Sequence, residues 1–231
     1  MRGRAEIMIS IVMPCLDEAQ NIISVLEPLQ AMRARGHEVI LVDGGSRDQT
    51  PDLARPLVDL ILETTAGRAR QMNAGLARAR GDIVWFLHAD TLAPPDMDCR
   101  IMECLEAGGR PWGHCRVRLS GSHPSLRIIE TFMNRRSCLT GIATGDQGIF
   151  AIRTTLLELG GYDEIPLMED IALSRRLKKF CGPPLCLSRH LVTSARRWED
   201  HGIWRTVLLM WQLRLAYFLG ADPEKLAALY R

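Results

Sequence analysis

Short apolar runs alternate with segments of helical periodicity over the first 87 residues of the chain. The apolar runs have the length of strands that are buried on both faces, and they cover 7–13, 38–42, 59–62 and 82–87. The segments between them repeat apolar residues at helical spacing, which predicts helices over 18–35, 48–57 and 67–80. Strands and helices that alternate in this way form a mostly parallel sheet covered on both faces. We therefore predict an α/β domain.

The second half of the chain is less regular. It is predicted to contain helices over 95–107, 124–139 and 165–179, and strands over 112–119 and 146–152. No repeat, low-complexity tract or linker interrupts the sequence. We therefore expect one domain over 1–201, followed by a helical tail over 202–231.

Composition and charge narrow the class of protein. Hydrophobic residues make up 47% of the 231 residues and charged residues 24%, as in ordinary soluble domains. A net charge of +2 with scattered basic residues gives no reason to expect a nucleic-acid partner. No window has the roughly 18 uninterrupted apolar residues of a membrane span, and Ser10 breaks the N-terminal apolar run, unlike a signal peptide. We expect a cytoplasmic protein.

The cysteines indicate a reducing compartment. Seven cysteines are spread along the chain without a CxxC pair, and their odd number does not suit a disulfide framework. Cys181, Cys186 and His190 lack the tight paired spacing of a zinc site. The sequence therefore predicts neither a disulfide framework nor structural zinc.

Two of the predicted strands end in an aspartate. Asp43 follows one strand in VILVDGGS, and Asp90 follows another in IVWFLHADT. Because ligands of parallel sheets bind at the carboxyl ends of the strands, we expect the two acids to share one site. Asp43 suits hydrogen bonds to a nucleobase or ribose, or it caps a plain turn. Asp90 suits Mg²⁺ or Mn²⁺, or it is a loop acid bonded to the backbone. His88 either contacts the nucleotide or metal or packs beside the strand.

Three further segments carry groups that suit a diphosphate or an acceptor. Glu169 and Asp170 precede an amphipathic helix, where acids either cap the helix or supply a general base. Arg68 and Asn73 lie near the start of another helix, a position that attracts anions or simply faces solvent. The segment SARRWED places two arginines beside Trp198, which suits a phosphate clamp.

The order of these elements is more specific than any one of them. The motifs PxxDE, DGGS, RxxQxNxG, HAD, GDQGIF, ED and RRW follow one another over about residues 7–200. This order resembles that of family 2 glycosyltransferases with the GT-A fold, and is most similar to a compact bacterial subgroup that also has HAD and a short helical C-terminus. The resemblance implies a mostly parallel central sheet with helices on both faces.

The resemblance also implies roles for individual residues. Asp90 would bind a divalent cation, Mn²⁺ or Mg²⁺, on the diphosphate, and Asp170 would be the general base. The nucleotide and donor site would comprise Pro14, Leu16, Glu18, Asp43, Gly44, Ser46, Arg68, Asn73, His88, Ala89 and Asp90. The acceptor and diphosphate side would comprise Gln147, Glu169, Arg197 and Trp198.

Three motifs depart from the family pattern. Leu16 and Asp17 stand where the family has an aromatic residue and an asparagine, which weakens base stacking. His88 replaces the first acid of the DxD motif, which removes one carboxylate near the cation. The glutamine of the QxxRW motif falls on Ser194 or Ala195, so that motif is only partly present.

The resemblance implies transfer of a sugar from a UDP- or GDP-type donor to an acceptor hydroxyl, with inversion. A sugar-nucleotide pyrophosphorylase is an alternative, but IVMPCLDEAQN lacks its Gly-rich phosphate loop. A non-catalytic protein that keeps the fold and binds a nucleotide or partner is another. The tail carries a stripe of large apolar residues that would pack on the domain, form a homodimer face or lie on a membrane: Trp204, Leu208, Leu209, Trp211, Leu215 and Phe218.

Overall fold

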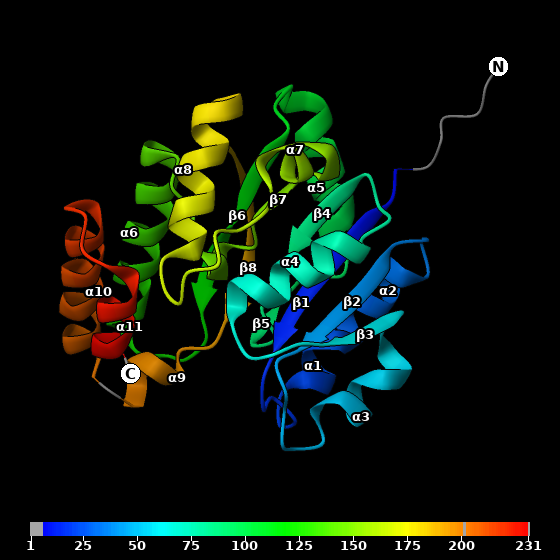
Figure 1. Ribbon diagram of the computed structural model, residues 1–231, viewed down its shortest axis with the longest axis horizontal. Coiled ribbons are helices and arrows are strands. Elements are labelled where there is room, and N and C mark those ends of the chain that lie inside the picture. Colours follow the sequence, from blue (N-terminus) through cyan, green and yellow to red (C-terminus); the bar gives the residue numbers. More distant parts are fainter. Residues whose placement is uncertain (1–6, 201, 231) are drawn as a thin grey trace.

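The first four strands along the chain form the parallel half of one sheet in the computed structural model, which describes residues 7–200 and 202–230 (Figure 1). They are β1 (Ile9–Cys15), β2 (Glu38–Asp43), β3 (Leu60–Glu63) and β4 (Ile83–Phe86). The register of β1 and β2 places Cys15 beside Asp43, so their carboxyl ends meet at one edge. The prediction of an α/β fold is confirmed.

The other half of the sheet is mixed. It contains β5 (Thr91–Leu92), β6 (Trp112–Leu119), β7 (Phe150–Ile152) and β8 (Leu185–Thr193), and the full strand order is β3-β2-β1-β4-β7-β6-β8-β5. Strand β7 runs antiparallel to both β4 and β6, whereas β8 runs parallel to β6 and antiparallel to β5. The sequence did not predict β5 or β8. Polar residues in the middle of β8 and the two-residue length of β5 leave little strand pattern to detect.

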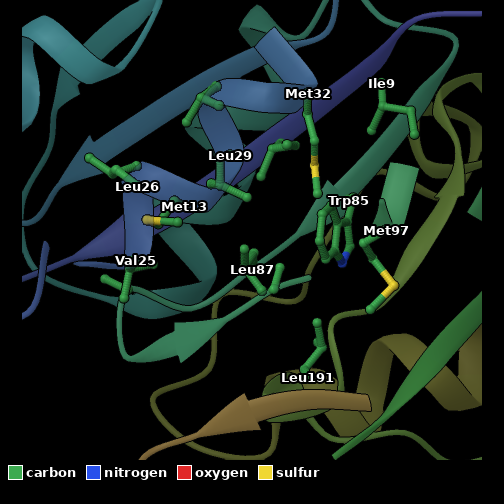
Figure 2. Packing of buried hydrophobic residues seen from close by; sticks show 14 of the residues in the cluster. Ile9, Met13, Val25, Leu26, Leu29, Met32, Trp85, Leu87, Met97 and Leu191 are labelled. Atoms are coloured by element: carbon green, nitrogen blue, oxygen red, sulfur yellow. The ribbon is translucent and has the colours of Figure 1, made fainter. Parts of the chain in front are cut away.

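Helices cover both faces of the sheet. One face is covered by α1 (Ile22–Leu26), α2 (Gln30–Arg33), α3 (Thr50–Ala54) and α5 (Met97–Gly108). Figure 2 shows Trp85 of β4 beside Met32 and Met97 in the apolar cluster on this face. The other face is covered by α4 (Arg68–Arg78), α7 (Arg153–Leu159) and α8 (Glu169–Cys181), where the rings of Phe86 and Tyr162 meet edge to face at 4.9 Å.

Several boundaries differ from the sequence predictions. The helix expected over 18–35 is interrupted at Pro28 by the 3-10 turn η1 (Glu27–Leu29), because proline disrupts continuous α-helical hydrogen bonding. The helix expected over 48–57 ends in a second such turn, η2 (Arg55–Leu57), at Pro56. The strand expected over 146–152 begins only at Phe150, since η3 (Gly145–Gln147) precedes it. The helix expected over 165–179 starts at Glu169, after Met168 in the left-handed region with a φ of 69°.

The tail packs against the domain. Helices α10 (Ile203–Phe218) and α11 (Pro223–Tyr230), in orange and red, lie beside α6 (Pro124–Thr140) in Figure 1. Leu213 and Leu226 are buried in an apolar cluster with Met168 and Ile171. The outer face of α10 remains exposed, with large apolar side chains at Trp204, Leu208, Trp211, Leu215 and Phe218. Within 7–200 and 202–230, no helix combines the length and the hydropathy that crossing a bilayer requires.

One cysteine pair differs from the sequence prediction. Cys138 of α6 and Cys186 of β8 form a disulfide, and His114 Nε2 lies 3.4 Å from Cys186 Sγ. The two cysteines are 48 residues apart, and only the fold brings them together. The described residues therefore include one disulfide, with five free cysteines elsewhere.

Candidate active site

Asp43 organises the loop that follows β2. Its Oδ2 accepts hydrogen bonds from the backbone N–H groups of Gly45 (3.0 Å) and Ser46 (2.9 Å), and its Oδ1 accepts one from the Ser46 hydroxyl. The Ser46 hydroxyl in turn accepts a 2.9 Å bond from the N–H of Asp17, which has a φ of 54°. These bonds join the loops after β1 and β2 at the edge of the sheet, where the Leu16 side chain is exposed.

Glu18 connects the β1 loop with the C-terminal part of the domain. Its backbone N–H donates to Thr50 Oγ1 at 2.8 Å, and its Oε2 accepts from Asn21 Nδ2 at 2.8 Å. Arg196, the first residue of α9 (Arg196–Asp200), donates from Nη2 to the same Oε2 at 3.4 Å. Arg196 is therefore a member of the site that the motif comparison did not single out.

The start of α4 is fastened against the same strand ends. Gln71 Nε2 donates 2.8 Å bonds to the carbonyl groups of Cys15 and Val42. A Cβ added at Gly44 would lie 3.1 Å from Gln71 Nε2, so the absence of a side chain at Gly44 allows this close approach. Pro14 pairs with Val42 in the sheet and is buried.

Both ends of the Asn73 side-chain amide form hydrogen bonds with the backbone of Tyr162. Nδ2 donates to the Tyr162 carbonyl at 2.9 Å, and Oδ1 accepts from the Tyr162 N–H at 2.8 Å. A Cβ at Gly161 would lie 2.4 Å from Asn73 Oδ1. These contacts give Asn73 a structural role that the sequence prediction of a donor-binding residue did not include.

The HAD segment leaves the sheet directly after β4. Ala89 is buried, and the His88 ring lies against Gly145, where an added Cβ would be 2.5 Å from His88 Cε1. Burial, with a smaller contribution from the positive charge of Arg68, lowers the pKa of His88 to about 3. The imidazole is therefore neutral near pH 7, and its Nε2 is buried without a hydrogen-bond partner among the described residues.

Asp90 is the carboxylate of this segment that suits a cation. Its backbone carbonyl accepts a 3.2 Å bond from the N–H of Ser194, which fixes the loop beside β8. Its Oδ1 accepts one 3.2 Å bond from the Thr91 hydroxyl, which leaves carboxylate lone pairs for another partner. Mg²⁺ and Mn²⁺ prefer hard oxygen ligands and few protein groups, so the donor set fits such an ion.

Glu169 and Asp170 open α8 on the opposite side of the site. Glu169 is buried and lies 3.7 Å from Arg68 Nη1. Burial, and after it the negative charge of Asp170, raise the pKa of Glu169 to about 7 against the opposing effect of Arg68. Asp170 Oδ2 accepts a 2.7 Å bond from the N–H of Gly145, which is also the residue under the His88 ring. The HAD segment and the ED pair therefore meet at one glycine.

Of the remaining predicted residues, Gln147 and Trp198 pack inside the protein, and the side chain of Arg197 lies outside the described part of the structure. Gln147 is fully buried, donates to Ser137 Oγ at 2.8 Å and accepts from Thr144, so it fastens η3 to α6. Trp198 packs in an apolar cluster with Leu126 and residues of β6 and α10. The backbone of Arg197 belongs to α9, but its side chain lies outside the described part of the structure.

Three charged residues near Asp170 were given no role at the site by the sequence analysis. Asp146 of η3 is close enough that its charge and that of Asp170 act on the guanidinium of Arg136 on α6. Arg214 on α10 acts on the same group. These residues come from three separate elements and carry no shared motif, so only the fold reveals their proximity.

Comparisons with known proteins assign the chain to a family. The profile of glycosyl transferase family 2 matches residues 10–160. The poly-beta-1,6-N-acetyl-D-glucosamine synthase of Staphylococcus aureus (strain COL) is 26% identical over 188 residues, which cover 73% of this chain and 45% of the synthase. The undecaprenyl-phosphate 4-deoxy-4-formamido-L-arabinose transferase of Pseudomonas savastanoi pv. phaseolicola (strain 1448A / Race 6) is 31% identical over 167 residues, which cover 65% of this chain and 48% of the transferase. This chain thus spans about half the length of the curated relatives it matches.

A solved structure shares the fold. The mannosyltransferase PcManGT from Pyrobaculum calidifontis, in complex with GDP-Man and Mn²⁺, superposes with a TM-score of 0.68 at 21% identity, covering 96% of this chain and 68% of that one. The family profile covers more than half of the 231 residues. The chain is therefore a member of glycosyl transferase family 2, and it has the GT-A fold.

Proposed function

We propose that this protein transfers a sugar from a nucleoside diphosphate donor to an acceptor hydroxyl, with inversion at the anomeric carbon. The observation that carries the proposal is the meeting of the HAD segment and the ED pair at Gly145. One segment holds the residue suited to a diphosphate-bound cation, and the other holds the residue suited to a base. A donor and an acceptor that occupied these two sides would meet at the same place.

The donor is a UDP- or GDP-type sugar. The Asp43 loop and the exposed Leu16 lie at the carboxyl ends of β1 and β2, where nucleotides bind in open α/β sheets. Support also comes from the mannosyltransferase that shares the fold, which was solved with GDP-Man and Mn²⁺. In this chain Asp43, Gly44 and Ser46 would hold the nucleoside, with Pro14 and Glu18 beside them.

A divalent cation would be held by Asp90 and the donor's diphosphate. When bound, it would neutralise charge on the leaving diphosphate. Arg68 would add a second positive charge from α4, because its guanidinium is within electrostatic range of Asp90 and exposed enough to reach a ligand. His88, being neutral, would contribute no charge and would line the pocket beside the cation.

Asp170 would act as the general base. It would take the proton of the acceptor hydroxyl while the oxygen attacks the anomeric carbon from the face opposite the diphosphate. The hydrogen bond from Gly145 holds Oδ2 in place. Glu169 would remain a neighbour that is neutral or paired with Arg68, rather than a second base.

Asp170→Asn tests this assignment. General-base catalysis supplies about 10²–10⁴ in rate, so turnover should fall by about that factor while nucleotide affinity stays unchanged. Asp52→Asn, at a solvent-exposed position on α3, is the matched control and should leave both quantities unchanged. Wild-type turnover in Asp170→Asn would remove Asp170 from the mechanism. Nucleotide binding without turnover in the wild type against every acceptor would favour a non-catalytic nucleotide-binding protein.

The exposed face of α10 would contact the surface of a membrane from the cytoplasmic side. Its apolar residues recur at helical spacing, and Trp204, Trp211 and Phe218 are 63%, 68% and 75% exposed. Such an apolar face beside basic residues binds anionic bilayers without crossing them. Trp204→Ser/Trp211→Ser should lose pelleting with vesicles that contain phosphatidylglycerol, while thermal stability is kept. A homodimer that dissociates in the same variant, with no vesicle binding in the wild type, would assign the face to a second copy of the chain.

A further inference from the structure

Two arginines near Asp146 and Asp170 have donor groups without a partner in the described part of the chain. Nε and Nη2 of Arg136 and Nε of Arg214 are buried, and they form no hydrogen bond within the described part of the chain. A buried N–H group that lacks an acceptor costs free energy, and a charged one costs more. A partner from outside the chain, such as water, an ion or a ligand, would satisfy them.

The nearby acids do not satisfy these groups. Both oxygens of Asp170 accept 2.7 Å bonds from backbone N–H groups, Oδ2 from Gly145 and Oδ1 from Ile171. Burial, and after it the positive charge of Arg214, lower the pKa of Arg136 to about 10, and Asp146 and Asp170 offset only part of this effect. Two cations of like charge thus lie near each other at the acceptor side, a placement that an added anion would stabilise.

The two arginines are held in place by their neighbours in sequence. Ser137, next to Arg136 on α6, is buried and accepts a bond from Gln147. Leu213, next to Arg214 on α10, is buried against Met168 and Ile171, the residues that flank the ED pair. Helices α6 and α10 also lie side by side in Figure 1, joined by an apolar cluster. The fold therefore fixes both arginine positions relative to Asp170.

We infer that Arg136 and Arg214 bind an oxyanion of the acceptor, a phosphate or a carboxylate, next to the hydroxyl that Asp170 deprotonates. This inference rests on the proposed function. Guanidinium groups donate parallel hydrogen bonds to such oxyanions, which fixes orientation as well as charge. A neutral acceptor would leave both cations unpaired and is disfavoured. The tail of the chain thus supplies a residue that recognises the acceptor.

A phosphate could come from a water-soluble molecule or from a lipid. The same two helices expose large apolar side chains on their outer faces, at Ile128, Phe132 and Leu139 of α6 and at Trp211 and Leu215 of α10. Glycerol 3-phosphate and lysophosphatidic acid share a hydroxyl and a phosphate and differ in the acyl chain. Glycerol and monoacylglycerol are the corresponding neutral compounds, so the four probes separate the charge from the chain.

The test is calorimetric titration of the full chain with the four probes, in the wild type and in R136Q and R214Q. The phosphorylated probes should bind the wild type and lose at least tenfold in affinity in each variant. The controls R135Q and R205Q, at exposed arginines of the same helices, should bind like the wild type. Preference for glycerol 3-phosphate or for lysophosphatidic acid then identifies the source of the phosphate. Neutral probes that bind as tightly as phosphorylated ones, or variants that bind like the wild type, would overturn the inference.

Melting temperatures with phosphate and titrations with UDP and GDP distinguish a failure of this inference from a failure of the proposed function. Phosphate should raise the melting temperature of the wild type and leave that of R136Q unchanged, whereas arginines that only stabilise the fold would make R136Q less stable without any phosphate response. UDP and GDP are titrated into the same samples. Nucleotide binding with a lost phosphate response in the variants supports both conclusions. Nucleotide binding with no selective phosphate binding overturns the inference alone, and absence of nucleotide binding in the wild type overturns the proposed function.

Discussion

The Asp170 carboxylate accepts a 2.7 Å hydrogen bond from the backbone N–H of Gly145, in the turn between α6 and β7. The His88 ring packs against the same glycine, so Asp170, the turn and the HAD segment share one point of contact. A change of shape at Gly145 must therefore reach both sides of the site.

Gly145→Ala tests this coupling. The added Cβ would lie 2.5 Å from His88 Cε1, so the ring or the turn must shift, and overpacking of this kind costs about 1–3 kcal/mol of stability. We expect a lower melting temperature and a lower turnover number. In the His88→Ala background the same change should cost much less stability, because the ring is gone. An equal loss of stability in the wild-type and His88→Ala backgrounds would show that contact with the His88 ring does not cause it.

Glu169→Gln should change the pH dependence of stability. The pKa of Glu169 is raised to about 7 from an ordinary value near 4.5, so the folded state holds its proton more tightly than the unfolded state does. Stability contributed by this proton is fully present below about pH 4.5 and is lost as pH rises through about 7. Denaturant unfolding should show the variant more stable than the wild type at pH 8.5, by roughly 1–3 kcal/mol, with a smaller difference at pH 5.

Glu164→Gln provides the control for that measurement. Glu164 is more than half exposed, and its ion pair with Arg70 is 3.6 Å long. Its substitution should change stability by the same small amount at both pH values. A Glu169→Gln effect that was equally independent of pH would contradict the raised pKa.

Asn73→Ala separates a structural role from a donor-binding role. The two hydrogen bonds to the Tyr162 backbone would be lost, at a cost of about 1–3 kcal/mol in the free energy of unfolding. Nucleotide affinity should stay within about twofold of the wild type, because the Asn73 amide is bonded to the Tyr162 backbone. A tenfold loss of affinity would correspond to about 1.4 kcal/mol of binding free energy. Unchanged stability with a tenfold loss of nucleotide affinity would place Asn73 on the donor instead.

Local pattern in the sequence predicted where the acids of the candidate site lie in the fold, and their roles stay predictions. Asp43 and Asp90 follow apolar strands whose order in the sheet obeys general rules, so their shared edge could be anticipated. Asp170 was singled out because the ED pair matches a motif of the family, and it lies in the first turn of α8. Each of these residues stands at the end of an element that its own neighbours specify.

The rest of the site depends on contacts between distant segments. Arg136 and Arg214 lie on different helices, 78 positions apart in the numbering, and each looks like an ordinary basic residue of an amphipathic helix. The disulfide between Cys138 and Cys186 likewise joins α6 to a strand that the sequence did not predict. Periodicity describes which face of an element is buried, but it does not describe which other element covers that face.

Calorimetric titration with UDP and GDP, each with and without Mn²⁺, addresses the donor site of the wild type, Asp90→Ala and the exposed control Asp52→Ala. One nucleotide should bind the wild type and the control, more tightly with Mn²⁺, and Asp90→Ala should lose the Mn²⁺-dependent gain. That result would establish a metal-assisted donor site at Asp90 and identify the donor as UDP- or GDP-linked. Binding of neither nucleotide to the wild type under any of these conditions would contradict the assignment of this edge of the sheet as a nucleotide-sugar site.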